Sequence, residues 1–286
     1  MADLRSIKEW FQNSPTPVFD YHQLRKLYAE QKRTWNLKED TSLDDFPGFL
    51  TQHTKLTKVQ LAAKGKESIV RYTWGEISPL TLAAYYTPRA YLSHGTAVFL
   101  HGLNDLIPRN VYVNKEQSKK EPPQHTPSQE AVDSAFRKPQ RKSIPYTDGE
   151  NTFFLLYGKN SDDYGVVQLP GPDGYSLRVT GLERTLVDIA VRPAYSGGVF
   201  QVLEAYKTAL PRISVKELYS TLRDLHYAYP YQQTIGFYLE KAECPKRELT
   251  RFRKAISEID FYLDYDIPDK RREYDQSWKL FYPKGL

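Results

Sequence analysis

The stretch LTKVQLAAKGKESIVRYTW, residues 56–74, decides the fold of the first part of the chain. Apolar and polar residues alternate on both sides of Lys64-Gly65-Lys66, and each half contains β-branched residues. This pattern is typical of half-buried strands joined by a turn, because successive side chains of a strand point to opposite faces. We therefore predict a β-hairpin whose tip carries two lysines.

An amphipathic helix precedes this hairpin. The segment FDYHQLRKLYAEQKRTW, residues 19–35, places Leu24, Leu27 and Tyr28 at the i, i+3, i+4 spacing of one helical face. Basic residues fall on the other side of the same helix. We therefore expect its apolar face to pack against the hairpin.

Two shorter helices are predicted from their start signals. Ser6 followed by Glu9 has the form of a capping box. SLDDFPGFLTQHT, residues 42–54, also begins with a serine, and we expect a short, irregular helix there because Pro47-Gly48 interrupts it. Helices followed by a basic hairpin follow the order of a winged helix-turn-helix, which we place in residues 1–77.

A winged helix would use these basic and polar side chains on duplex DNA. The hairpin tip would contact phosphates, and Gln52 is the side chain best suited to read a base edge. The candidate DNA-binding residues are Arg25, Lys26, Ser42, Gln52, Thr54, Lys55, Lys58, Lys64, Lys66 and Arg71. The formal net charge of +5 is compatible with such a partner. A merely solvated basic hairpin is the alternative interpretation.

The remaining residues, 78–286, predict a larger mixed α/β domain, so the fold class expected for the whole chain is α+β. Strands are expected at TFFLLYG and on both sides of the turn Gly171–Gly174, and a last strand at FYLDY. Helices are expected after the capping signals of Thr180–Glu183 and Ser214–Glu217. Residues 114–145 are rich in Pro, Gln, Ser and Lys, and we interpret them as a flexible, basic surface insertion with one short helix.

The run YLSHGTAVFLHGL, residues 91–103, carries His94 and His101 among apolar residues. Seven residues of helix rise about 10.5 Å, so these imidazoles are too far apart to ligate one metal ion. We expect a packing helix that Ser93 begins and Gly102 ends. His101 would lie next to the helix C-terminus, where the helix dipole favours its protonation.

Signals for catalysis are weak. The chain contains no phosphate-binding glycine loop, no zinc-protease motif and no serine-hydrolase elbow. Its single cysteine, Cys244, excludes a disulfide framework and a cysteine-only zinc site within one chain. Arg184 and Asp188, four residues apart, predict a structural ion pair. We expect no cofactor, no metal and no enzymatic activity; a nuclease using Asp162, Asp163 and Glu183 is the alternative.

Four stretches together are similar to one protein family. YLSHGTAVFLHGL, IPRNVYVNKEQ, VTGLERTLVDIAVRPAYSGG and IGFYLEK resemble the AbiEi-type antitoxins of type IV toxin–antitoxin systems, which act in abortive infection against phage. The resemblance covers roughly residues 15–240. The matching positions are Tyr91, Ser93, His94, His101 and Gly102 in the first motif, and Thr180, Glu183, Arg184, Thr185 and Asp188 in the second.

This resemblance implies a winged helix that binds inverted repeats in the promoter of its own operon. It also implies a C-terminal antitoxin domain that counteracts a partner nucleotidyltransferase toxin, with no catalytic role for the matched residues. We expect a DNA-binding antitoxin and autorepressor. An interaction protein of a defence system that does not bind DNA is the second hypothesis, and the metal-dependent nuclease is the third.

The sequence gives no sign of a membrane or export segment. No stretch approaches the ~18 consecutive apolar residues of a membrane span, and the first residues contain no apolar signal core. One cysteine in the chain fits a reducing compartment. We therefore expect a cytoplasmic protein.

Overall fold

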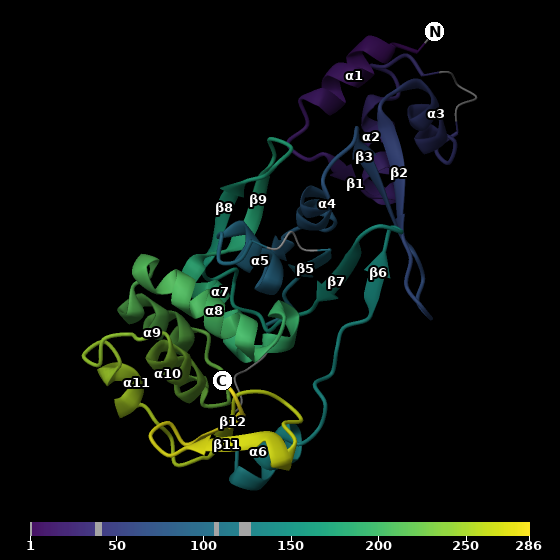
Figure 1. The fold of residues 1–286 in the computed structure, drawn as a ribbon. Coiled ribbons are helices and arrows are strands. Elements are labelled where there is room, and N and C mark those ends of the chain that lie inside the picture. Colours follow the sequence, from purple (N-terminus) through teal and green to yellow (C-terminus); the bar gives the residue numbers. More distant parts are fainter. Residues whose placement is uncertain (1, 38–41, 106–108, 120–126) are drawn as a thin grey trace.

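The computed structural model describes residues 2–37, 42–105, 109–119 and 127–286. Helices and three sheets combine in an α+β fold. Figure 1 shows an elongated molecule, with a small N-terminal unit at one end, a mixed sheet in the middle and a helical region at the other end.

The N-terminal unit contains three helices and a three-stranded sheet. Its elements are α1 (Leu4–Gln12), β1 (Val18–Phe19), α2 (Tyr21–Gln31), α3 (Phe46–His53), β2 (Leu56–Leu61) and β3 (Ile69–Trp74). The strands are ordered β1-β3-β2, and both pairs are antiparallel. The predicted hairpin is confirmed, with Leu61 opposite Ile69 and Leu56 opposite Trp74. Leu24, Leu27 and Tyr28 of α2 are buried in the unit's core, as the spacing predicted.

Two predictions for the helices of this unit are wrong: the cap of α1 and the interruption of α3. The side chain of Asp3, not of Ser6, caps α1, because its carboxylate accepts the Ser6 amide at 3.0 Å. Pro47 does not interrupt α3, because it lies in the first turn, where a proline has no backbone hydrogen bond to lose.

A six-stranded mixed sheet forms the middle of the molecule. Its strands are β4 (Tyr91–Leu92), β5 (Asn110–Asn114), β6 (Pro145–Thr147), β7 (Thr152–Leu156), β8 (Val166–Pro170) and β9 (Ser176–Thr180), in the order β6-β7-β5-β4-β9-β8. Alternate residues such as Leu92, Val113 and Phe153 share one core with α4 (Pro79–Tyr85). Tyr91 and Asn114, one position along on β4 and β5, therefore point to the opposite face.

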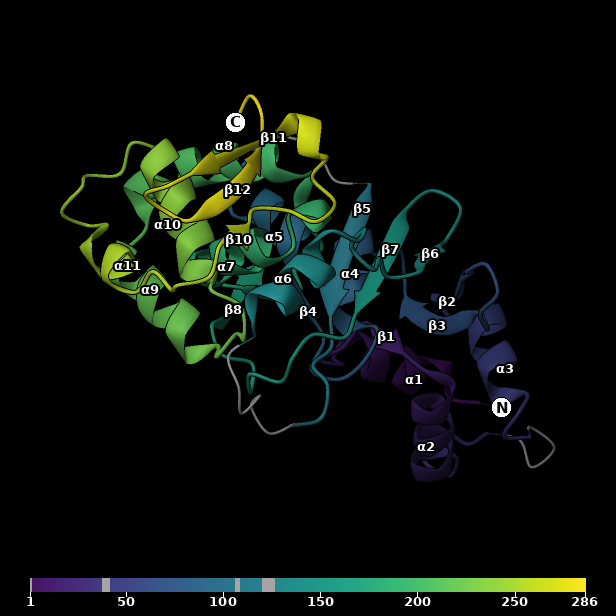
Figure 2. The same ribbon diagram turned by 90° about the horizontal axis from the view of Figure 1, so that it is seen from below.

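The helical region contains α5 (His94–Leu100), α6 (Gln129–Phe136), α7 (Leu182–Val191), α8 (Val199–Ala209), α9 (Val215–Asp224), α10 (Tyr231–Lys241) and α11 (Thr250–Lys254), with a short 3-10 turn, Pro193–Ser196, after α7. Helix α5 contacts β5 of the sheet and α7, and α7 in turn contacts α8, α9 and α10. A small sheet, ordered β10-β12-β11, lies beside α10 in Figure 2; its strands are Phe261–Tyr262, Leu280–Pro283 and Arg272–Asp275. Among the described residues, no helix is long and apolar enough to cross a bilayer.

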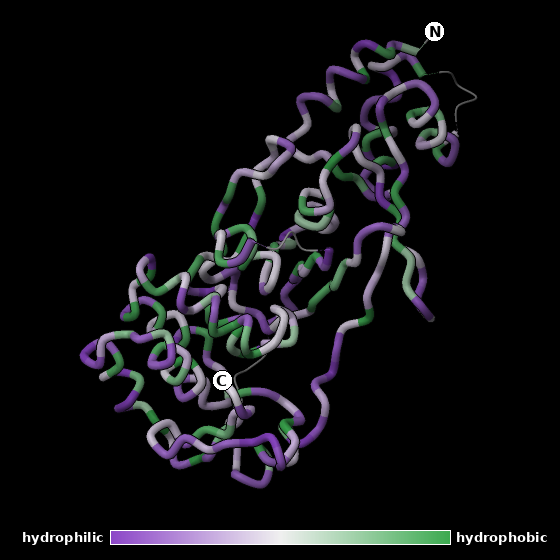
Figure 3. The backbone as a smooth tube through the Cα atoms, viewed as in Figure 1, coloured by the Kyte–Doolittle hydropathy of each residue, from purple (hydrophilic) through white to green (hydrophobic). Residues whose placement is uncertain are grey.

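The expectation of a solvated surface segment is wrong for α6. Val132 and Phe136 are buried in the large helical core, and the Phe136 ring stacks on Tyr265 at a centroid distance of 4.3 Å. The predicted short helix is confirmed, but the polar composition gave no sign of its burial, because its apolar residues are few and fall on one face. The segment that follows, residues 137–144, is mostly hydrophilic in Figure 3; residues 120–126 of the predicted insertion lie outside the described residues.

The N-terminal unit and the middle sheet share a core. Val18 and Leu61 of the first unit pack in the same cluster as Leu82 and Phe153. At the end of β2, Ala62 forms a β-bridge with Thr147 of β6. The hairpin is therefore anchored on the second sheet just before its tip, and the tip extends beyond this contact (Figure 1).

Candidate functional site

Most of the predicted DNA-binding side chains lie on the surface of the N-terminal unit. Exposed members of this set are Arg25, Lys26, Ser42, Gln52, Lys55, Lys58, Lys64 and Lys66. On α2, Lys26 pairs with Glu30 at 3.9 Å, and the Arg25 guanidinium lies over the Tyr21 ring at 5.7 Å. The lysines of the hairpin form no ion pair among the described residues, so they are the side chains best able to meet phosphates.

Three members of the set have structural roles. Arg71 donates to the carbonyls of Tyr86 at 2.6 Å and Val70 at 2.7 Å, and burial lowers its pKa. It therefore holds β3 against the segment after α4 and does not contact phosphate from this position. The Thr54 hydroxyl donates to Leu50 at 2.6 Å at the end of α3, and the Ser42 hydroxyl accepts the Asp45 amide at 3.1 Å.

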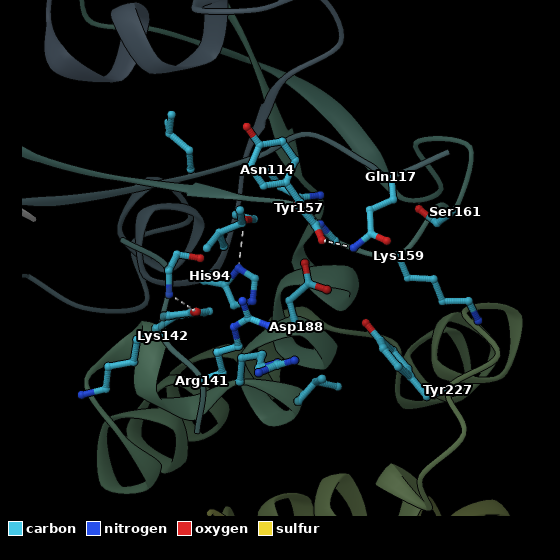
Figure 4. A pocket seen from close by; sticks show the side chains of 18 of the residues that line it. His94, Asn114, Gln117, Arg141, Lys142, Tyr157, Lys159, Ser161, Asp188 and Tyr227 are labelled. Carbon is cyan, nitrogen blue, oxygen red and sulfur yellow. Dashed lines mark hydrogen bonds between the residues drawn. The ribbon is translucent and has the colours of Figure 1, made fainter. Parts of the chain in front are cut away.

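Five motif residues of the second domain line a cavity of about 920 Å³: Tyr91, Ser93, His94, Arg184 and Asp188. Tyr91 and Asn114 of the sheet form one wall, and α7 forms the opposite wall with Arg184, Asp188 and Arg192. The hairpin tip reaches its rim through Lys66. Figure 4 shows the side chains of Asp188 and Tyr227 directed into the space between these walls. From the sequence, His94 was expected in a packing helix and Arg184 and Asp188 in an ion pair, and no cavity was predicted.

A chain of hydrogen bonds joins the two motifs. Arg184 donates to Asp188 at 2.9 Å and to the Ser161 hydroxyl at 3.1 Å, and the predicted ion pair is confirmed. Ser161 donates its amide to Glu116 at 2.8 Å, and Glu116 accepts the Tyr91 hydroxyl at 3.0 Å. Burial alone would lower the pKa of Arg184, but the adjacent Asp188 charge outweighs it and raises this pKa.

His94 lies at the cavity wall as a neutral imidazole. Its Nδ1 is 2.9 Å from the Ser93 hydroxyl, and its ring meets the Tyr195 ring edge-on at 5.5 Å. Burial lowers the pKa of His94 to about 4, and the positive charges of Arg192 and Arg184 act in the same direction. The group therefore cannot act as a cation near neutral pH.

His101 is not the protonated residue that we expected. It does cap the C-terminus of α5, and Gly102 follows with φ +63°, but burial lowers the pKa of His101. Its Nε2 is 2.7 Å from the carbonyl of Thr180 and donates to it. The amides of Gly102 and Leu103 bond back to Phe99 and Val98, which closes the helix in a Schellman motif.

The predicted capping box of α7 is also wrong. The cap residue is Gly181, whose neighbour Thr180 places its hydroxyl 2.9 Å from that of Thr185. The Glu183 carboxylate accepts the Ser214 amide at 3.3 Å instead of its own helix start. The motif residues Thr180 and Thr185 thus join the end of β9 to α7, and Glu183 joins α7 to the start of α9.

The carboxylates of the alternative nuclease are not assembled into a metal site. Asp163 is held by Arg178 at 2.6 Å and Arg89 at 2.9 Å. Burial alone would raise the pKa of Asp163, but these guanidinium hydrogen bonds lower it. Across residues 2–37, 42–105, 109–119 and 127–286, no three His, Cys, Asp or Glu side chains lie close enough to hold an ion.

Sequence reasoning missed most of the cavity wall. Ser161 of the wall lies in a polar run that looks solvated, as does its hydrogen-bond partner Glu116 behind it, and the segment that carries Arg141 and Lys142 was interpreted as part of a surface insertion. The tyrosines that line the cavity come from six separate parts of the chain: Tyr91, Tyr146, Tyr157, Tyr195, Tyr227, Tyr229, Tyr231 and Tyr265. The high tyrosine content, 22 residues, is the one signal that pointed to them.

The chain is thus an α+β protein in which a small N-terminal unit with a hairpin precedes a larger domain of sheets and helices. No family model and no curated protein matches the sequence. Among solved structures, it is similar to the crystal structure of the RV2827C protein from Mycobacterium tuberculosis, with a TM-score of 0.59 and 16% sequence identity. The match covers 98% of this chain and 91% of that one, so the two share the fold over nearly their whole lengths.

Proposed function

We infer that the chain is a DNA-binding antitoxin that represses transcription of its own operon. One observation carries the DNA-binding half: the order α1-β1-α2-α3-β2-β3, with a sheet ordered β1-β3-β2 and a basic hairpin at its end. This is the arrangement of a winged helix-turn-helix, in which α3 would enter the major groove. The hairpin would then serve as the wing.

The exposed side chains of this unit would make two kinds of contact with DNA. Lys64 and Lys66 at the hairpin tip would neutralise phosphates, which gives affinity without sequence information. Gln52, exposed near the end of α3, would contact a base edge. Arg71 is left out of this proposal because its guanidinium is engaged by backbone carbonyls.

The antitoxin half rests on the family resemblance of the motifs around the cavity. The proposed partner is a nucleotidyltransferase toxin, counteracted directly or through its target. The buried Arg184–Asp188 pair and the Thr180–Thr185 contact give these motif residues structural contacts within that domain, and the proposal assigns them no catalytic role.

Duplex DNA from the region upstream of the gene, compared with random duplex of equal length, tests the first half. Fluorescence anisotropy across a salt series should show a preference for the upstream sequence and a steep loss of affinity as salt rises. Equal binding to both duplexes at moderate salt contradicts the repressor proposal. Co-expression with the product of the adjacent reading frame tests the second half, with growth rescue as the expected result.

A further inference from the structure

The cavity carries more positive charge than its own carboxylate can neutralise. Among the described residues, its lining contains six lysines and arginines, and Asp188 is the one acidic residue. That carboxylate is already paired with Arg184 at 2.9 Å. Within the described part of the chain, Arg192, Arg141 and Lys142 have no carboxylate partner, although all three line the cavity. A hollow with unpaired cations on its wall is suited to an anionic ligand.

The same cavity presents aromatic faces. Tyr157 is 62% exposed at its edge, and Tyr227, Tyr229 and Tyr265 are half-buried in its wall. Figure 4 shows Tyr227 and Tyr157 on opposite sides of the hollow. A site for a simple anion has no use for such rings, whereas a planar heterocycle stacks on them with a favourable free energy.

We propose that this cavity binds a nucleotide, with the base against the tyrosines and the phosphates against Arg192, Arg141 and Lys142. The volume of about 920 Å³ lies in the upper part of the range for small-ligand sites and leaves no room for a duplex. The nucleotide is either a free nucleoside phosphate or the terminal nucleotide of a single strand, because both offer one accessible base next to phosphate.

The polar groups around the cavity restrict where the base can be read. Asn114 is not available, because its amide donates to the Tyr91 hydroxyl and its carbonyl accepts the Gly158 amide. His94 uses one ring nitrogen on Ser93. The other ring nitrogen has no hydrogen-bond partner among the residues that the structure describes, and neither does the Tyr227 hydroxyl, so these two groups are available to a base edge.

The inference is independent of the proposed function. The cavity belongs to the second domain, and only Lys66 at its rim belongs to the hairpin unit. A chain that fails to recognise its upstream DNA can still bind a nucleotide here, and a repressor with an empty cavity would leave the DNA-binding proposal intact. The two proposals therefore fail in different experiments.

Calorimetry on the full chain tests the proposal with defined probes. The four ribonucleoside triphosphates and five-nucleotide single strands of RNA and DNA are compared with inorganic tripolyphosphate and with unphosphorylated nucleosides. We expect a nucleotide to bind about fivefold tighter than tripolyphosphate, because stacking of one base contributes ~1 kcal/mol or more. If only the single strands bind tightly, the site takes a strand end. If only the triphosphates bind tightly, it takes free nucleotides. Equal affinity for tripolyphosphate and nucleotides, or no binding of either, overturns the proposal.

Matched variants locate the binding. Arg192→Gln should weaken nucleotide affinity roughly tenfold or more, because it removes a charged hydrogen-bond donor. Tyr157→Ser should weaken nucleotide binding but leave tripolyphosphate binding unchanged. Arg271→Gln and Tyr274→Ser, at exposed positions that do not line the cavity, are the controls and should stay within about twofold. Circular dichroism and thermal unfolding confirm that each variant is folded. Unchanged nucleotide affinity in folded Arg192→Gln contradicts the assignment.

Discussion

The backbone of Ala62, at the end of the hairpin's first strand, is joined to the backbone of Thr147 in the second sheet by two hydrogen bonds of 2.8 Å. The hairpin is therefore fixed directly beside its tip, and Lys64 and Lys66 are exposed just beyond this anchor. A rigidly presented basic tip loses little conformational entropy when it meets a phosphate backbone.

Replacing both tip lysines with alanine should weaken binding to all duplexes to a similar degree. Phosphate contacts carry no base information, so the preference for the upstream sequence should persist. The slope of log affinity against log salt should become less steep by about one unit per lost contact. Anisotropy titrations at several salt concentrations measure both quantities. Gln52→Ala is the contrasting variant, expected to reduce sequence preference with little change in the salt slope.

Removing one partner of the Arg184–Asp188 pair should be strongly destabilising. Both side chains are almost fully buried, with 7% and 6% of their surfaces exposed. Arg184→Met would leave a buried carboxylate without its partner, at a cost of ~3–5 kcal/mol of unfolding free energy. Urea unfolding measures this change. The exposed Lys207–Glu204 pair is the control, since Lys207→Ala should change stability by less than about 1 kcal/mol.

The double variant Arg184→Met, Asp188→Leu distinguishes a charge effect from loss of packing. If the cost arises from an unpaired charge, the double variant should be more stable than Arg184→Met alone. A double variant as unstable as the sum of the two single changes would contradict this interpretation.

Local patterns predicted the parts of the fold that local interactions form. Alternation located the hairpin, and the spacing of Arg184 and Asp188 predicted their ion pair. The cavity could not be predicted in this way, because its wall joins residues as distant in sequence as Tyr91 and Tyr265. The short helix α6 was predicted, but its burial was not, because Val132 and Phe136 bury one face of an otherwise polar segment against elements far along the chain, such as Tyr265.

The stability of the chain should decrease as the pH falls below about 6.5, in part through His94. Its ordinary pKa is 6.5, and the folded structure lowers this to about 4. Between these values the unfolded chain binds the proton and the folded chain does not, so acid favours unfolding. The free energy of unfolding should therefore decrease progressively from pH 6.5 to about pH 4, by up to ~3 kcal/mol in total.

His94→Asn should flatten this part of the pH dependence, because asparagine does not titrate. Thermal unfolding of both proteins at intervals between pH 4 and pH 7 measures the difference. Parallel curves for the two proteins over this range would show that another group controls the acid sensitivity.

Two glycine-to-alanine changes in helices should have opposite signs. In α10, a Cβ on Gly236 would lie 2.2 Å from the ring of Trp278, which is fully buried. That indole cannot move away easily, because it donates to Glu240 and lies under the Arg253 guanidinium at 4.7 Å. Overpacking costs ~1–3 kcal/mol or more, which exceeds the ~1 kcal/mol that alanine contributes as a better helix former. Gly236→Ala should therefore destabilise the folded chain.

The second change lies in α3. A Cβ on Gly48 meets nothing within 4 Å, so Gly48→Ala should stabilise the chain by ~0.5–1 kcal/mol. Urea unfolding of the two variants beside the parent chain decides the matter, and a stabilised Gly236→Ala would show that Trp278 has room to move.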